Sequence, residues 1–182
     1  MSTALLVIDI QNDYFPGGAM ELVDSSEAGE QARKLIEAFR GKSLPVIHVQ
    51  HIATRPGASF FVPDTKGVEI HPSVVPRDGE TVIRKNFPNS FRDTPLLQHL
   101  RDNKITRLVI AGMMTHMCID STVRAAGDLG FECVLAHDAC ATRSLSFGGT
   151  TVPAATVHAA FLAALNGLFA RVQAADEVCA GL

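Results

Sequence analysis

The sequence predicts a doubly wound α/β fold built on a parallel sheet. Short, continuous apolar runs rich in branched residues recur along the chain, as is typical of strands buried on both faces. Segments with helical spacing of apolar residues alternate with these runs, which is the order of elements in doubly wound α/β domains. The chain has 182 residues, of which 47% are apolar and 19% are charged. This length and composition predict one globular domain covering residues 1–182.

Four apolar runs predict strands, at 4–10, 45–49, 107–111 and 131–136. A shorter candidate strand covers 81–84, and a weaker one covers 168–172. The first run contains Asp9, and a carboxylate inside a buried strand is costly unless it is paired or hydrogen-bonded. Asp9 therefore needs a specific explanation.

Four helices are predicted between these strands. The first spans about 25–40, the second begins at Thr94-Pro95, the third ends at Gly130 and the fourth runs from Pro153 to Gly167. Their apolar residues recur near helical spacing: Ala28, Ala32, Leu35, Ile36, Phe39, Leu96, Leu97, Leu100, Ile119, Val123, Ala126, Leu129, Val157, Phe161 and Leu165. The fourth helix is expected to pack tightly on the sheet. The long irregular stretch 52–80 predicts a wall or lid over a site.

Charge and motifs exclude several classes of protein. Sixteen Lys and Arg against nineteen Asp and Glu give a net charge of −3, so no basic surplus favours nucleic acid. No stretch has the ~18 uncharged apolar residues of a membrane span, and nothing resembles a secretory signal, so a cytoplasmic location is the default expectation. The chain lacks GxGxxG, GxxxxGK[ST] and GxSxG, so dinucleotide, P-loop and serine hydrolase chemistry are not predicted.

Polar residues follow several of the predicted strands. Ligands of open α/β sheets bind outside the carboxyl ends of the strands, and Asp9, His51, Lys85 and Cys118 fall there. Asp9 fits a general base, or else a carboxylate that binds backbone amides and shapes the loop 11–13. Lys85 is a solvated strand end unless it neighbours Asp9 and the thiol, where it would lower the thiol pKa.

Cys118 is the strongest candidate nucleophile. It lies where residues 112–118 join a buried strand to a helix, and the free amides of a first helical turn favour thiolate and receive an oxyanion. The alternative is a small apolar residue between helix and sheet. The other cysteines are assigned to a strand (Cys133), a loop (Cys140) and the tail (Cys179). No pair has CxxC spacing, so neither a zinc ribbon nor a dithiol redox motif is predicted.

Three histidines raise the question of a metal site. His48 and His51 point to opposite faces if both lie on one strand, so they share a metal only if the strand ends between them. They and His71 have no carboxylate at ligand spacing. No metal site is therefore predicted.

Three blocks of the sequence resemble the isochorismatase-like cysteine hydrolases, a family that includes nicotinamidases and N-carbamoylsarcosine amidases. The first is LVIDIQND at 6–13, followed by Phe15. The second is VIRK at 82–85, continued by NSFRDTPL at 89–96. The third is LVIAGMMTHMC at 108–118, followed by STVRAA at 121–126. The blocks stand in the family's order, and the resemblance runs from Ala4 to about Val178.

The resemblance implies a three-layer, Rossmann-like α/β/α sandwich around a six-stranded, mainly parallel sheet. It implies a catalytic triad of Asp9, Lys85 and Cys118. It also implies a cis peptide bond between Met113 and Met114, an oxyanion hole made by the backbone amides of Met114 and Cys118, and a homo-oligomer.

Departures from the motifs separate the relatives. Nicotinamidases carry a metal site of the Asp-x-His…His type, whereas this chain has His48-Val49-Gln50-His51 at the end of its second strand. True isochorismatases lack the cysteine, so Cys118 argues against that activity. The remaining group is that of amidohydrolases, including N-carbamoylsarcosine, ureidoacrylate and maleamate amidases.

We therefore expect a cysteine hydrolase that cleaves a C–N bond in a small amide or carbamoyl compound through a Cys118 thioester, with no cofactor. Two alternatives stay open: a vinyl ether hydrolase in which Asp9 acts as the acid, and a non-catalytic binding protein on the same fold. The residues expected to contact the substrate are Gln11, Phe15, His51, Phe87, Phe91, Thr115 and His116.

Overall fold

The computed structural model describes residues 2–182 and contains a six-stranded sheet in the order β3-β2-β1-β4-β5-β8. All neighbouring strands in this sheet are parallel. The strands are β1 (Ser2–Ile8), β2 (Val46–His51), β3 (Thr81–Lys85), β4 (Ile105–Met113), β5 (Glu132–Ala141) and β8 (Arg171–Gln173). A separate antiparallel hairpin consists of β6 (Leu145–Phe147) and β7 (Thr150–Val152). The predicted α/β fold with a six-stranded parallel sheet is confirmed.

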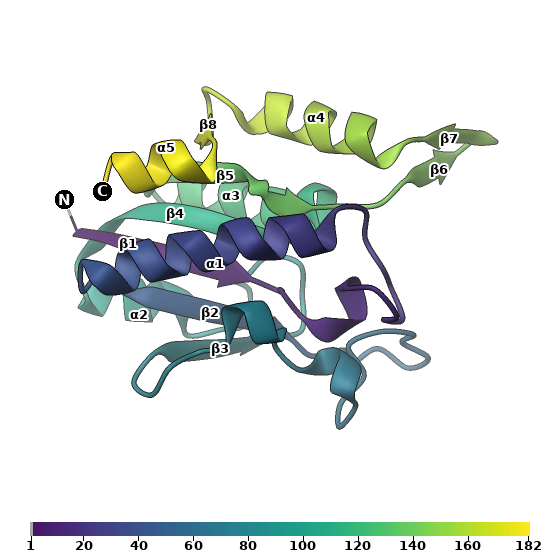
Figure 1. The fold of residues 1–182 in the computed structure, drawn as a ribbon, viewed down its shortest axis with the longest axis horizontal. Coiled ribbons are helices and arrows are strands. Elements are labelled where there is room, and N and C mark those ends of the chain that lie inside the picture. Colours follow the sequence, from purple (N-terminus) through teal and green to yellow (C-terminus); the bar gives the residue numbers. More distant parts are fainter. Residues whose placement is uncertain (1) are drawn as a thin grey trace.

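Helices cover both faces of the sheet (Figure 1). They are α1 (Ser25–Gly41), α2 (Leu96–Asp102), α3 (Asp120–Asp128), α4 (Ala154–Leu165) and α5 (Ala175–Ala180). Alternate residues of β1 enter different cores, because successive side chains of a strand point to opposite faces. Leu5 and Val7 pack with α1 and α5, whereas Leu6 and Ile8 pack with α2, α3 and the end of α4. The three-layer arrangement follows from this alternation.

Short turns complete the structure at the carboxyl edge of the sheet. Three 3-10 turns cover Asn12–Tyr14, Lys66–Val68 and Pro72–Val74, and a π-helical turn, Thr115–Ile119, joins β4 to α3. Among residues 2–182, no helix is long and apolar enough to cross a membrane.

Several predicted boundaries were wrong. Strand β1 ends at Ile8, so Asp9 follows the strand with a φ of 52°. Strand β5 continues beyond a register shift opposite Ile110 and Gly112, and it therefore includes Cys140. Cys179 lies in α5, a helix of six residues that is too short to show a clear apolar period.

The end of the chain also differs from the prediction. Strand β8 begins at Arg171 rather than at 168, and the β6-β7 hairpin was not predicted. Helix α4 buries only Ala154, Val157 and Leu165 of its twelve residues, so it does not pack tightly on the sheet over its length.

Candidate active site

The carboxyl ends of four strands bring the predicted reactive residues together. Asp9 directly follows β1, and His51 and Lys85 are the last residues of β2 and β3, where they stand opposite each other in register. Cys118 lies in the π-helical turn after β4. The predicted proximity of Asp9, Lys85 and Cys118 is therefore present in the structure.

Lys85 is at the centre of this group. Its Nζ donates to Asp9 Oδ2 over 2.6 Å and to Cys118 Sγ over 3.3 Å. It also lies 3.1 Å from His51 Nδ1 and 3.1 Å from the carbonyl oxygen of Phe87. An ammonium group has three donors, and four acceptors surround this one. At most three of these four contacts can therefore be full hydrogen bonds at one time.

Asp9 has one carboxylate oxygen committed and one available. Its side chain is fully buried, and Oδ2 accepts from Lys85. Oδ1 has no hydrogen-bond partner among residues 2–182. A carboxylate oxygen of Asp9 lies within 4.8 Å of Cys118 Sγ. Oδ1 is therefore a suitable acceptor for the thiol proton, because accepting it would satisfy a buried polar atom.

The electrostatics favour a neutral thiol at rest. Burial raises the pKa of Cys118, the Asp9 carboxylate raises it further, and Lys85 lowers it by a smaller amount, so the pKa is well above its usual range. Burial and the neighbouring carboxylate thus act against the thiolate that we expected the helix amides to favour. For Lys85, burial acts to lower the pKa, but Asp9 and Cys118 overcome it and the pKa is raised.

His51 is a neutral neighbour of the triad. Burial lowers its pKa, and Lys85 lowers it as well, although Asp9 acts in the opposite direction. Because the Lys85 ammonium cannot accept a hydrogen bond, His51 Nδ1 accepts from it and the ring proton is on Nε2.

The same residues form a potential set of metal ligands. Asp9, His51 and Cys118 offer ligand atoms within 4.8 Å of one another. However, Lys85 Nζ is within hydrogen-bond distance of all three side chains. A cation bound between them would be repelled by this ammonium group. The three histidines considered in the sequence analysis do not form one metal site. His48 Nε2 is within hydrogen-bond distance of Glu80, at 3.0 Å, and His71 Nδ1 is within hydrogen-bond distance of Ser73 Oγ, at 2.9 Å.

A glycine allows the two central strands to approach closely beside the triad. Gly112 has a φ of +138°, and a Cβ added there would lie 2.0 Å from the carbonyl oxygen of Ile8, the residue before Asp9. Any side chain would push β4 away from β1. The peptide bond between Met113 and Met114 that follows is cis, as the resemblance implies.

A cavity of about 370 Å³ opens onto Cys118, which is the size expected for a small ligand. Its wall is largely apolar, and Ala53, Thr54, Arg55, Ala58 and Phe60 contribute one side of it. The stretch 52–80 is therefore a wall over the site, as predicted. Three of the predicted site residues besides Cys118 line the cavity: His51, Phe87 and Met114.

Comparisons with known proteins agree with this geometry. Residues 3–177 match the Isochorismatase domain. The chain belongs to the isochorismatase family. An uncharacterized isochorismatase family protein of Bacillus subtilis (strain 168) is 52% identical over 97% of this chain and 98% of its own length. The chain is also 25% identical to the nicotinamidase of Escherichia coli (strain K12), over 75% of this chain and 82% of that protein.

Solved structures of isochorismatase family members have the same fold. A crystal structure assigned to the isochorismatase hydrolases, from Oleispira antarctica, superposes with a TM-score of 0.95 at 55% identity, covering 99% of this chain and 97% of that one. The N-carbamoylsarcosine amidase of Thermoplasma acidophilum superposes with a TM-score of 0.81 at 25% identity, covering 97% and 98%.

Five residues expected to contact the substrate lie outside the cavity wall of this isochorismatase family member. The Gln11 side chain donates to the carbonyls of His51 and Val68 and accepts from the His51 amide, so backbone groups use its hydrogen-bonding capacity. Phe15 stacks on His71 at 3.5 Å between ring centroids. The other three are Phe91, which stacks on Phe131, Thr115, which contacts Ala141 and His158, and His116, which bonds Thr142.

Two arginines in the wall were missed by sequence reasoning. Arg55 and Arg143 line the cavity, and neither forms a salt bridge within the described part of the chain. Both are exposed loop residues, so no periodicity or motif marks them. Tyr14 and Met20 also line the cavity.

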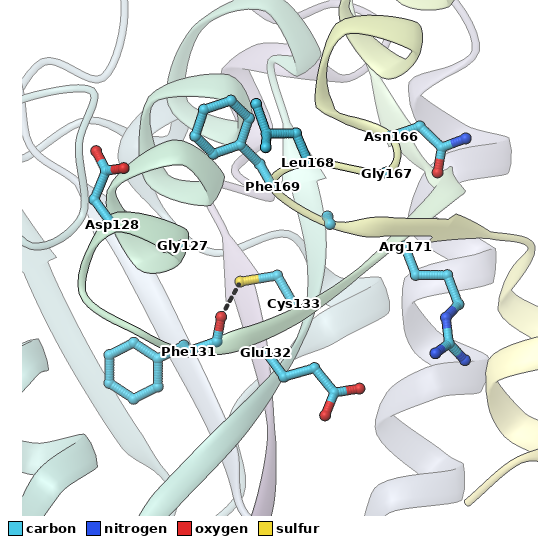
Figure 2. Close-up of a pocket in the computed structure, with 11 residues that line it drawn as sticks. Gly127, Asp128, Phe131, Glu132, Cys133, Asn166, Gly167, Leu168, Phe169 and Arg171 are labelled. Atoms are coloured by element: carbon cyan, nitrogen blue, oxygen red, sulfur yellow. Dashed lines mark hydrogen bonds between the residues drawn. The ribbon is translucent and has the colours of Figure 1, made fainter.

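A second cavity lies at the amino end of β5, between the end of α3 and the loop from α4 to β8 (Figure 2). It measures about 720 Å³. Its thiol, Cys133, donates to the carbonyl of Phe131 over 3.6 Å, and burial, with the neighbouring Glu132, raises the pKa of this thiol to about 12. Among residues 2–182, no hydrogen bond joins it to a carboxylate, an imidazole or an ammonium group, in contrast to Cys118.

Proposed function

We propose that this isochorismatase family member is a cysteine hydrolase of a C–N bond in a small amide or carbamoyl compound. The observation that carries the proposal is the position of Lys85 Nζ, within hydrogen-bond distance of both Asp9 Oδ2 and Cys118 Sγ beside a cavity. The names of two relatives, a nicotinamidase and an N-carbamoylsarcosine amidase, point to the same bond type.

The first half-reaction forms a thioester. Asp9 takes the proton of Cys118 as the sulfur attacks the carbonyl carbon, and the carbonyl oxygen becomes an oxyanion. The amides of Met114 and Cys118 are assigned to hold this oxyanion. As the C–N bond breaks, Asp9 gives the proton to the departing nitrogen, and ammonia or an amine leaves.

The second half-reaction releases the acid. Water attacks the thioester carbon and gives a proton to Asp9, and the C–S bond then breaks. The sulfur regains its proton from Asp9, which restores the neutral thiol that burial favours. Lys85 remains protonated throughout, in keeping with its raised pKa. Its ammonium group balances the negative charge, whether this charge lies on Asp9 or on Cys118.

The size of the cavity and the chemistry of its wall limit the compounds that could be substrates. An apolar wall of this size selects a small compound with apolar or aromatic parts. Arg55 and Arg143 have no salt-bridge partner among residues 2–182, so a carboxylate on the substrate would supply the missing counter-ion.

The test is ammonia release from a panel of primary amides and ureido acids. Cys118→Ala is expected to lower turnover of any accepted amide by about a thousandfold or more, because the nucleophile is lost. Cys133→Ala is the matched control, since this buried thiol lies in the other cavity. Undiminished turnover by folded Cys118→Ala would end the proposal. Cys118→Ser distinguishes this amidase from a vinyl ether hydrolase. The amidase would lose its activity, whereas a vinyl ether hydrolase that uses Asp9 as the acid would keep it.

A further inference from the structure

One segment of the cavity wall has a single hydrogen bond to the body of the protein. The segment 54–65 contains no helix or strand. Within residues 2–182, its only hydrogen bond to a residue outside 52–69 joins the Phe61 amide to Asp13 Oδ2 over 2.6 Å. Its other hydrogen bonds are local, and one of them joins the Phe61 carbonyl to the Ala53 amide. The wall segment therefore depends on a contact with a residue 48 positions away.

This wall segment, residues 54–65, borders the cavity that contains Cys118. Four of its residues line the cavity: Thr54, Arg55, Ala58 and Phe60. The chain that follows the segment is held by other residues, because Gln11 and Gln50 both donate to the carbonyl of Val68. Those bonds fix the base of the wall but leave its middle to the contact with Asp13.

Asp13 is a buried acid with no cation beside it. It is 7% exposed and forms no salt bridge within the described part of the chain. Instead, Oδ1 accepts from the Ala19 amide over 3.1 Å, and Oδ2 accepts from the Phe61 amide. A buried carboxylate is costly unless it is hydrogen-bonded, and bonds from backbone amides to a carboxylate are strong ones. The bond to Ala19 shapes a local turn, whereas the bond to Phe61 fixes a distant segment.

Phe61 links the position of Asp13 to the cavity. Its φ of 55° is strained for a bulky residue, and hydrogen bonds to its amide and its carbonyl hold it there. Its buried ring lies 4.6 Å from the ring of Tyr14 and 5.8 Å from that of His51, measured between centroids. Both neighbours line the cavity, and His51 Nδ1 lies 3.1 Å from Lys85 Nζ. The bond at Phe61 is thus connected through packed rings to the candidate active site.

We propose that Asp13 is a positioning residue, which holds the wall segment over the cavity through the Phe61 amide. Asp13 does not line the cavity, so it acts on the substrate only through the wall. This assignment rests on the proposed function, because the substrate is taken to be the amide bound in that cavity. The wall segment carries Arg55, so binding of an anionic amide depends most directly on the position of the wall.

Asp13→Ala is the first test, because it removes both acceptors. We expect KM for an anionic amide to rise by about tenfold, with a much smaller change in kcat, since the wall loosens while the triad remains. Asp13→Asn retains one acceptor oxygen and should give a smaller rise. Glu69→Ala is the matched control and should keep the wild-type KM, because this exposed carboxylate forms no hydrogen bond or salt bridge within residues 2–182. Loss of active enzyme at an unchanged KM would show a merely structural role and overturn the proposal.

Alkylation of Cys118 gives a second readout, which does not need the reaction. This thiol is 4% exposed, so iodoacetamide and the bulkier N-phenyl iodoacetamide must both reach it through the cavity. A loosened wall should speed the bulkier reagent several-fold relative to the smaller one in Asp13→Ala, but not in Glu69→Ala. If the wild type turns over no amide, the proposed function fails, and this ratio of rates still decides the role of Asp13. An unchanged ratio in folded Asp13→Ala overturns the proposal.

Hydrogen exchange of the wild type decides the case in which neither Asp13 variant folds. The Phe61 amide is bonded to a buried carboxylate and should exchange slowly. The amides of Thr54, Arg55 and Gly57 have no acceptor within the described chain and should exchange fast. This contrast supports a wall held at Phe61. Exchange at Phe61 as fast as at those three positions overturns it.

Discussion

Lys85 donates to Asp9 across 2.6 Å, and both side chains are completely buried. The contact joins the last residue of β3 to the residue after β1, two strands that are separated in the sheet by β2. A buried ion pair carries a large desolvation cost. Its presence beside a thiol is explained by a chemical role more readily than by stability.

The first prediction concerns the stability of this pair. Lys85→Met leaves the Asp9 carboxylate buried without its counter-ion, and we expect the free energy of unfolding to fall by about 3–5 kcal/mol. The double variant Asp9→Asn/Lys85→Met removes both charges and should recover part of the loss. Urea unfolding at pH 7 measures both. A double variant less stable than the single variant would contradict the assignment of an ion pair.

The second prediction concerns the thiol. Because burial and Asp9 raise the pKa of Cys118, its alkylation by iodoacetamide should accelerate with pH up to pH 9 and above, without a plateau near neutrality. Asp9→Asn removes a charge that raises this pKa, so alkylation at pH 8 should be faster in the variant. Mass spectrometry of the labelled peptide follows the rate. A wild-type plateau below pH 8 would mean that a thiolate is present at rest.

The third prediction concerns substrate charge. Arg143 lines the cavity without a salt-bridge partner in the described chain, so Arg143→Leu should raise KM for an anionic amide by about tenfold and leave kcat nearly unchanged. An uncharged amide of similar size is the control and should be unaffected. Equal effects on both substrates would show that Arg143 shapes the cavity rather than binds an anion.

The fourth prediction concerns stability at low pH. The Glu80 carboxylate forms a salt bridge with Arg40 Nε at 2.7 Å and a hydrogen bond with His48 Nε2 at 3.0 Å. Burial alone would raise its pKa, but the bonds from Arg40, the Arg77 amide and His48 lower it from 4.5 to about 2. A lowered folded-state pKa gives stability that is complete above about pH 4.5 and is lost as the pH falls towards 2.

Glu80→Gln should therefore cost about 1–2 kcal/mol at pH 7, with solvent screening reducing the effect, and the difference from wild type should shrink between pH 5 and pH 2. Glu37→Gln is the control, because its partner Arg33 is exposed and the pair contributes little. Denaturant unfolding at several pH values gives the comparison. A difference that does not change with pH would rule out the ionic contribution of Glu80.

Much of the fold could be predicted from local patterns. Apolar runs marked strands β1, β2, β4 and β5, because strands buried on both faces must be continuously apolar, although β5 continues five residues beyond its run. The edge strand β3, which has exposed residues at alternate positions, was found only as a shorter candidate. The weak sixth, β8, was misplaced by three residues because Leu168 and Phe169 are as apolar as a strand yet lie in a loop. The hairpin and α5 were missed because three- and six-residue elements carry no measurable period.

For the candidate site, the sequence predicted the reactive residues but not the wall of the cavity. Asp9, Lys85 and Cys118 could be found because each follows a strand and matches a motif. The cavity wall could not, since Arg55 and Arg143 come from loops that meet only in the folded chain. The structural contacts of Gln11 could not be predicted for the same reason, because its partners at His51 and Val68 are 40 and 57 residues away.

The sequence by itself determined the order of the sheet strands and of the first four helices, and it singled out Asp9, Lys85 and Cys118, because local patterns of apolar residues and short motifs encode both. Only the tertiary structure showed that the pKa of Cys118 is raised, since this shift comes from burial and from a carboxylate 109 positions away. It also separated cavity wall from core among the aromatic residues and showed that helix α4 lies largely on the surface. These properties depend on distances between remote residues, which no local pattern encodes.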